Sequence, residues 1–154
     1  MRLQKTESAL VRSLSRDPLL VQRVERLQTI PAVGPITALT WALEIGDVKR
    51  FPSLKQVISY CGLCGDEKSS ANIAKRTPIS KQRNKHLQRV LVEAAKMAPR
   101  NSPELAMLYD KEKQKGNANR ATLAVARKLV AYLVAVDRRQ KDFLTVEREN
   151  RTAA

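Results

Sequence analysis

Two adjacent serines, Ser69 and Ser70, are the side chains in this sequence best placed for nucleophilic chemistry. They lie in a glycine-bounded stretch that leads directly into a run of lysines and arginines. A serine hydroxyl in such a place could attack a phosphodiester whose charge the neighbouring cations neutralise. The alternative is that the two serines only form a turn or cap a helix, which is the more common role of serine in loops.

Other catalytic arrangements have less support. His86 is the single histidine, and no carboxylate in its basic segment would orient it, so a Ser-His-Asp arrangement cannot be argued. The acidic residues near the serines are scattered, and their spacing forces no two-metal carboxylate cluster. These acids are Glu44, Asp47, Asp66 and Glu67.

Cys61 and Cys64 form a C-x-x-C motif. A structural zinc site needs four ligands, and the chain has no second pair of cysteines or histidines. A redox pair would be expected between a strand and a helix, whereas the surroundings here are helical. We therefore expect two small, half-buried residues and no metal site in this chain.

The segment from Ile73 to Arg100 is strongly basic. It holds eight lysines and arginines against one acid, Glu93, and so accounts for half of the net charge of +14. Such a cluster can converge on a phosphate backbone, whereas the alternative is a solvated face. Aromatic residues make up 4% of the chain, so a stacking platform for single strands is not expected. The predicted phosphate-binding cations are Lys75, Arg76, Lys81, Arg83, Lys85 and Arg89.

The stretch from Leu27 to Asp47 is the second predicted phosphate-binding element. An apolar turn ends at Gly34, and Pro35 then suits the first position of a helix because its missing N–H costs nothing there. This is the outline of a helix-hairpin-helix, in which unpaired N–H groups at a helix start bind phosphate without reading bases. We expect Gly34 to allow close backbone approach and a positive φ. The alternative is an ordinary turn between two helices.

Composition limits the class of protein. The 154 residues are enough for one compact domain with a helical arm, and the charge favours a polyanionic partner. No apolar run of about 18 residues could span a membrane, and the N-terminus lacks the apolar core of a signal peptide. We expect a cytoplasmic protein. The alternative is that the positive charge forms a solvated basic face, of the kind found in ribosomal or chaperone-binding proteins.

Apolar periodicity predicts an all-α fold. Helices are expected over residues 3–15, 17–27, 35–45, 53–60, 80–98, 102–115 and 119–137, with an irregular segment at 61–79. The expected organisation is an N-terminal helical arm at 1–26, a helix-hairpin-helix domain at 27–137 and a polar, frayed tail at 138–154. The arm could dimerise, so a homo-oligomer is a further expectation.

Several blocks of the sequence occur in the order typical of one family. They are LQTIPAVGPITAL, EIGDVKRFPSLKQ, YCGL, SSA and ISKQRNKHLQRVLVEAA. The succession resembles the C-terminal domain of the insertion-sequence transposases of the IS-one-ten, IS-one-one-six and IS-nine-oh-two group. This resemblance implies RNA-guided serine recombinases, in which a separate acidic domain of the RuvC type binds Mg²⁺ and a serine becomes covalently attached to DNA.

The resemblance assigns roles to particular residues. Ser70 matches the family's serine, and Ser69 is the second choice. The sequence departs from the family pattern at three places: Ala71 follows the serine in place of glycine, Ala32 replaces the first hairpin glycine, and Cys64-Gly65 stands where Val-Pro is typical. The matched nucleic-acid-binding positions are Pro31, Val33, Gly34, Ile36 and Thr37 in the hairpin, and Lys81, Asn84, His86 and Arg89 in the basic block.

We therefore expect a transposase C-terminal domain that binds DNA, and a structured guide RNA as a second partner, and that supplies Ser70 for strand exchange with Arg76, Lys81 and Arg83 stabilising phosphate charge. No counterpart of the acidic domain precedes the matched blocks, so the polypeptide alone is not expected to transpose DNA. The alternatives are a non-catalytic helix-hairpin-helix binding module and an inactive transposase remnant.

Overall fold

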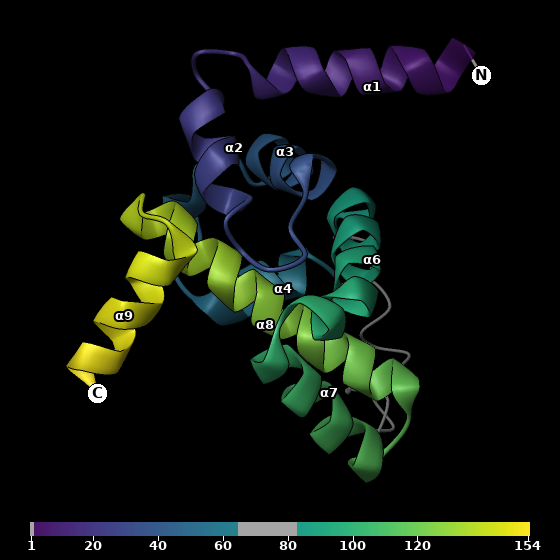
Figure 1. The fold of residues 1–154 in the computed structure, drawn as a ribbon, viewed down its shortest axis with the longest axis vertical. Helices are drawn as coiled ribbons and strands as arrows, with labels where there is room; N and C mark the ends of the chain where they lie inside the picture. The colour runs from purple at the N-terminus through teal and green to yellow at the C-terminus, as the bar shows by residue number, and fades with distance from the viewer. Residues whose placement is uncertain (1, 65–82) are drawn as a thin grey trace.

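The computed structural model describes residues 2–64 and 83–154. Every regular element in these residues is a helix, which confirms the all-α fold class (Figure 1). None of the helices in this part of the chain is long and apolar enough to cross a membrane. In chain order the elements are α1 (Arg2–Ser15), α2 (Val21–Leu27), α3 (Pro35–Ile45), η1 (Val48–Arg50), α4 (Leu54–Tyr60), α6 (Lys85–Asn101), α7 (Pro103–Lys115), α8 (Ala118–Arg139) and α9 (Phe143–Ala153).

Helix α8 is the centre of the hydrophobic core. Its buried residues recur every three or four positions, as Val125, Leu129, Leu133 and Val136 illustrate, so a broad apolar stripe runs along the helix. It packs against α2, α4, α6, α7 and α9, and Figure 1 shows it running diagonally through the middle of the molecule. Because α3 and α6 also pack against each other, the two predicted nucleic-acid-binding helices belong to one packed body.

Polar side chains fix where several helices begin. Ser53 and Ser102 accept hydrogen bonds from the backbone N–H groups of Gln56 and Leu105, each over 3.3 Å, as expected for N-caps. Asn84 and Asn117 cap α6 and α8 in the same way. These caps satisfy donors that a helix start otherwise leaves unpaired.

Two helix boundaries differ from the sequence prediction. Helix α2 begins at Val21, because Asp17 first forms a turn in which its carboxylate accepts from Leu19 N over 2.8 Å. Helix α6 begins at Lys85 and continues through Pro99 to Asn101, although we expected this proline to end it. The proline lies in the last turn, where the loss of one backbone N–H affects a hydrogen-bond ladder that is about to end.

The end of the chain also differs from expectation, since residues 143–153 form helix α9 and not a frayed tail. Phe143 and Val146 are buried and attach this helix to the core. The Phe143 ring packs edge-on against Tyr132 with 4.7 Å between ring centroids, and Phe143 N donates to Thr29 Oγ1 over 2.9 Å. Two apolar residues at helical spacing were enough to order a segment that is otherwise polar.

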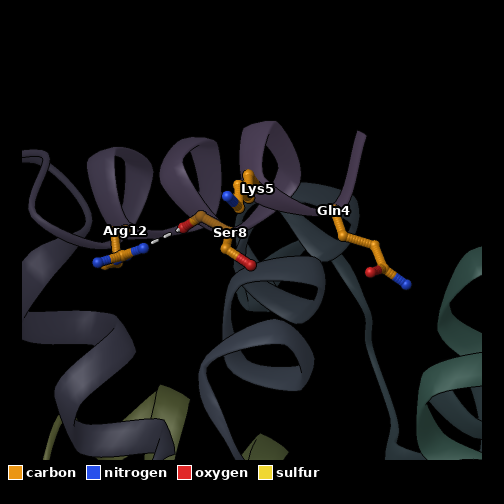
Figure 2. Close-up of a pocket in the computed structure, with 4 residues that line it drawn as sticks. All are labelled: Gln4, Lys5, Ser8 and Arg12. Atoms are coloured by element: carbon orange, nitrogen blue, oxygen red, sulfur yellow. Dashed lines mark hydrogen bonds between the residues drawn. The ribbon is translucent and has the colours of Figure 1, made fainter. Parts of the chain in front are cut away.

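Helix α1 extends along one side of the molecule and has no buried residue (Figure 1). Leu3 and Leu10, two large apolar residues of this helix, are 86% and 57% exposed. A surface pocket on this helix is lined by Gln4, Lys5, Ser8 and Arg12 (Figure 2). Because all four residues come from one exposed helix, no second element encloses the pocket and we assign no site to it.

Candidate nucleic-acid interface

The connection between α2 and α3 is a tight turn. Backbone hydrogen bonds from Ile30 N to Leu27 O (3.2 Å) and from Val33 N to Ile30 O (3.1 Å) fold it back on itself. Ile30 and Val33 are buried and hold the turn on the core. Val33 therefore contributes to packing, and its predicted contact with nucleic acid would have to come from its backbone.

The positive φ in this turn belongs to Ala32 and not to Gly34. Ala32 has a φ of 67°, which is the left-handed region that glycine adopts without strain. Gly34 has a φ of −93° and a ψ of −174°, an extended conformation that any residue adopts. The expectation that Gly34 takes a positive φ is therefore wrong, and the residue that replaces the family's first hairpin glycine carries the strained conformation.

Gly34 is nevertheless unusual because no contact with the described residues requires its lack of a side chain. A Cβ built on Gly34 would have no atom within 4 Å, so the space beside it is open. Gly34 is the N-cap of α3, and it offers no side-chain cap to the first turn. The start of α3 thus combines open space with helix N–H groups and the positive end of the helix dipole.

The other hairpin residues differ in exposure. Ile36 is 52% exposed, whereas Pro31 and Thr37 are half-buried. No acidic residue lies in the first turn of α3, so the turn has no built-in negative charge to compete with a bound anion. Of these predicted contacts, Ile36 is therefore the most accessible, and Pro31 and Thr37 are accessible in part.

Exposed cations gather at the start of α6. Arg83, Lys85, His86 and Arg89 are all exposed. Lys85 and Arg89 are four residues apart and so lie on one helix face, which Lys96 and Arg100 continue. Glu93 forms an ion pair with Lys96 at 3.5 Å and is the one acid of this helix. The helix therefore presents a mainly basic face to solvent.

Asn84, another predicted contact, makes its hydrogen bonds inside the chain. Its Oδ1 accepts from Leu87 N over 2.9 Å, and its Nδ2 donates to Glu44 Oε2 over 2.7 Å and to Tyr60 Oη over 3.3 Å. Neither the pairing of Glu44 with Asn84 nor a role for Tyr60 was predicted from the sequence. The position of Asn84 just before a helical pattern was the available indication of a cap.

The two ends of the undescribed segment lie together. Asn84 N donates to Tyr60 O over 2.7 Å. Gln88 Nε2 donates to Gly62 O, and Arg127 Nη1 donates to Leu63 O, each over 2.9 Å. These hydrogen bonds therefore hold the residues that follow α4 against the start of α6 and against α8. The predicted residues Ser69, Ser70, Lys75, Arg76 and Lys81 lie outside the described residues.

The cysteines of the C-x-x-C motif have different environments. Cys61 is buried and Cys64 is exposed. Burial, with a smaller contribution from Cys64, raises the pKa of the Cys61 thiol to about 12. A thiol with this pKa stays protonated at neutral pH and is a poor nucleophile or metal ligand. Within residues 2–64 and 83–154, no group of three or more His, Cys, Asp or Glu is placed to hold a metal ion.

The fold and the site together define a basic domain, all-helical in the described residues, in which α3, whose start has no side-chain cap, packs against the cation-rich helix α6. The chain belongs to the IS116/IS110/IS902 transposase family, whose family model matches residues 24–110. This confirms the resemblance stated from the sequence blocks. The matched residues include both the hairpin and the whole of α6.

Individual relatives agree with this assignment. The chain is 31% identical over 77% of its length to the transposase for insertion sequence element IS1111A of Coxiella burnetii, covering 34% of that protein. It is 30% identical over 73% of its length to the IS1328 transposase of Yersinia enterocolitica, covering 36% of it. It is also 30% identical over 82% of its length to a pilin gene-inverting protein of Moraxella bovis, covering 40% of it. No solved structure matches.

Proposed function

We propose that this chain binds the phosphate backbone of DNA, and of a structured guide RNA, through the start of α3 and the basic face of α6. The chain spans about a third to two fifths of the length of the three relatives named above, so it corresponds to only part of those proteins. Phosphate contacts of this kind hold a nucleic acid in register and carry no base sequence information. They are the contacts a recombinase domain needs before its chemistry begins.

Gly34 is the observation that carries this proposal. Its backbone conformation is ordinary, and no atom of residues 2–64 or 83–154 lies beside it, so neither strain nor packing within this part of the chain requires a glycine there. Close approach of something outside the chain does explain it. A phosphate oxygen fits this place, because the N–H groups and the dipole at the start of α3 attract an anion.

The neighbouring cations support the same ligand. Arg83, Lys85 and Arg89 are exposed on the first turns of α6, and α6 packs directly against α3. The net charge of +14 makes a polyanion the expected partner of the whole domain. The two elements can therefore contact phosphates of the same strand or groove without a large rearrangement of the fold.

Catalysis is the second part of the proposal. Ser70 would attack a DNA phosphorus atom, with Ser69 as the second candidate. The new bond joins the serine oxygen to phosphorus, the bond from phosphorus to one sugar oxygen breaks, and the serine proton ends on that sugar oxygen. Arg76, Lys81 and Arg83 would stabilise the phosphate charge, and Mg²⁺-binding acids would come from a domain outside this chain.

The experiment that tests the binding proposal is Gly34→Ala. Because a Cβ meets no described atom and φ is negative, this variant should fold, and its lower unfolded-state entropy roughly offsets the loss of about 1 kcal/mol expected when alanine replaces glycine at an N-cap. Binding to duplex DNA should weaken about tenfold, since the methyl group occupies the place of the phosphate. An equally stable variant with unchanged affinity would contradict the proposal.

The alternative is a non-catalytic binding module. Ser70→Ala separates the two functions in an assay of strand cleavage with the acidic domain added in trans. The enzyme hypothesis expects cleavage and covalent attachment to disappear while DNA binding persists. Cleavage that survives in Ser70→Ala but disappears in Ser69→Ala would move the role to the neighbouring serine, and cleavage that survives in both would leave only the binding module.

A further inference from the structure

Every backbone and side-chain polar group of Asn84 is used inside the protein. Its N–H donates to Tyr60 O over 2.7 Å, and its C=O accepts from Gln88 N over 3.0 Å. Its Oδ1 caps α6 through Leu87 N, and its Nδ2 donates to Glu44 Oε2 over 2.7 Å. Asn84 is also only partly exposed. No donor of this residue is left over for a phosphate.

The contacts of Asn84 join three helices at one point. Glu44 lies in the last turn of α3, Tyr60 is the last residue of α4, and Asn84 precedes the first residue of α6. Tyr60 Oη closes the triangle, because it accepts from Asn84 Nδ2 over 3.3 Å and donates to Glu44 O over 3.4 Å. The hydrogen bond from Asn84 to the Glu44 carboxylate is short, as expected where the acceptor is a carboxylate.

Arg50 stiffens the same junction. Its Nε donates to Ile45 O over 2.8 Å, at the end of α3. Its guanidinium also lies over the ring of Tyr60, 5.1 Å from the centroid, and over that of Phe51 at 4.3 Å. The end of α3 and the end of α4 are therefore fixed relative to each other independently of Asn84.

We infer that Asn84 is a positioning residue, which with Glu44 sets the start of α6 against α3 so that the α6 cations and the hairpin face one phosphate backbone at a fixed separation. This inference rests on the proposed function. Helix α3 connects the two elements, because Gly34 directly precedes its first residue and Glu44 lies ten residues further along, about 15 Å at 1.5 Å per residue. The role differs from the direct contact that the family resemblance predicts for Asn84.

Two variants of the full chain test this inference at constant net charge. Asn84→Ser keeps a good N-cap but removes the donor to Glu44. The double variant Glu44→Gln/Asn84→Asp reverses the pair: the introduced aspartate still caps α6, and the introduced glutamine amide donates to it. Ser102→Ala is the matched control, because it removes the N-cap of α7 and leaves the Glu44–Asn84 pair intact.

The measurement is affinity for a duplex DNA at low salt, on variants shown by circular dichroism to be folded. We expect Asn84→Ser to bind about tenfold more weakly than the wild type, and both the reversed pair and Ser102→Ala to bind within about twofold of it. Wild-type affinity in Asn84→Ser overturns the inference, as does a reversed pair as weak as the single variant. If Asn84 contacted a phosphate directly, the reversed pair would also bind weakly, because the introduced aspartate would place a carboxylate against that phosphate.

Binding by the wild-type chain distinguishes failure of this inference from failure of the proposed function. If the wild-type chain does not bind duplex DNA or structured RNA even at low salt, the proposed function fails and the inference fails with it. If the wild type binds and Gly34→Ala weakens it, while Asn84→Ser binds normally, only the positioning role of Asn84 is lost.

Discussion

Arg23 and Asp137 form a bidentate ion pair although 114 residues separate them in the chain. Arg23 Nε and Nη2 donate to the two oxygens of Asp137 over 2.9 and 2.8 Å. Trp41 Nε1 donates to the same carboxylate over 3.0 Å, and Arg23 Nη2 also donates to Gly46 O over 2.6 Å at the end of α3. One carboxylate thus fastens α2 and α3, the helices on either side of the turn at residues 28–34, to α8.

Asp137→Ala should destabilise the fold strongly. The Asp137 side chain is 5% exposed and that of Arg23 is 22% exposed, so removing the carboxylate leaves a largely desolvated guanidinium and the buried Trp41 N–H without their acceptor. Breaking a buried pair from one side costs about 3–5 kcal/mol, and partial exposure of Arg23 favours the lower end. Urea unfolding at pH 7 measures the change.

The control for this prediction is Asp142→Ala, which removes an exposed carboxylate from a residue that provides no side-chain cap to α9. It should change the free energy of unfolding by less than about 0.5 kcal/mol. An Asp137→Ala variant as stable as this control would show that the buried ion pair makes no net contribution.

Ala32→Gly should stabilise the protein. Ala32 has a φ of 67°, and a left-handed conformation costs a residue with a Cβ about 1–2 kcal/mol. Glycine removes this strain but adds entropy to the unfolded chain, so we expect a net gain of about 0.5–1 kcal/mol in urea unfolding. Gly46→Ala is the converse experiment, because Gly46 has a φ of 65° and a ψ of −123°, which lies outside the left-handed helical region, while a Cβ there meets nothing within 4 Å. It should lose more than Ala32→Gly gains, and a gain in both would refute the strain argument.

Local features of the hairpin could be predicted, whereas its geometry could not. Pro35 at the first helical position and Gly46 beyond the last one indicated α3 correctly. The left-handed residue was expected at Gly34, because glycine is its usual occupant, and the structure has it at Ala32. The turn is held by burial of Ile30 and Val33, and this packing is strong enough to impose a strained φ on alanine.

Contacts between residues that are far apart in the chain could not be predicted from the sequence. Ser53 and Ser102 indicated their helix starts because a cap depends on residues three positions away. The Glu44–Asn84 pair spans 40 residues, and no local pattern shows that the end of α3 meets the start of α6. For this reason Asn84 was predicted as a nucleic-acid contact on resemblance alone, and that prediction stays untested.

Cys61 should be protected from thiol reagents in the folded protein. Its pKa is raised from 9.0 to about 12, mainly by burial, so the folded thiol is protonated where the unfolded one ionises. Its contribution to stability is therefore complete below pH 9 and is lost as the pH rises from about 9 to about 12. In a Cys64→Ser variant, which isolates the Cys61 signal, labelling at pH 8 should be at least about a hundredfold slower than in urea. Equally fast labelling would mean that the site opens readily.

Arg89→Gln should reduce the dependence of DNA binding on salt. Each phosphate that a protein neutralises contributes about 0.9 to the slope of log affinity against log salt, because bound counterions are released. Arg89 is exposed on the basic face of α6, so losing its charge should lower the slope by about one and weaken binding similarly on unrelated sequences. Lys111→Gln removes an equally exposed charge from α7, at the other end of the molecule from α3 (Figure 1), and should leave the slope unchanged. Equal losses in the two variants would indicate that binding follows net charge and has no defined place on α6.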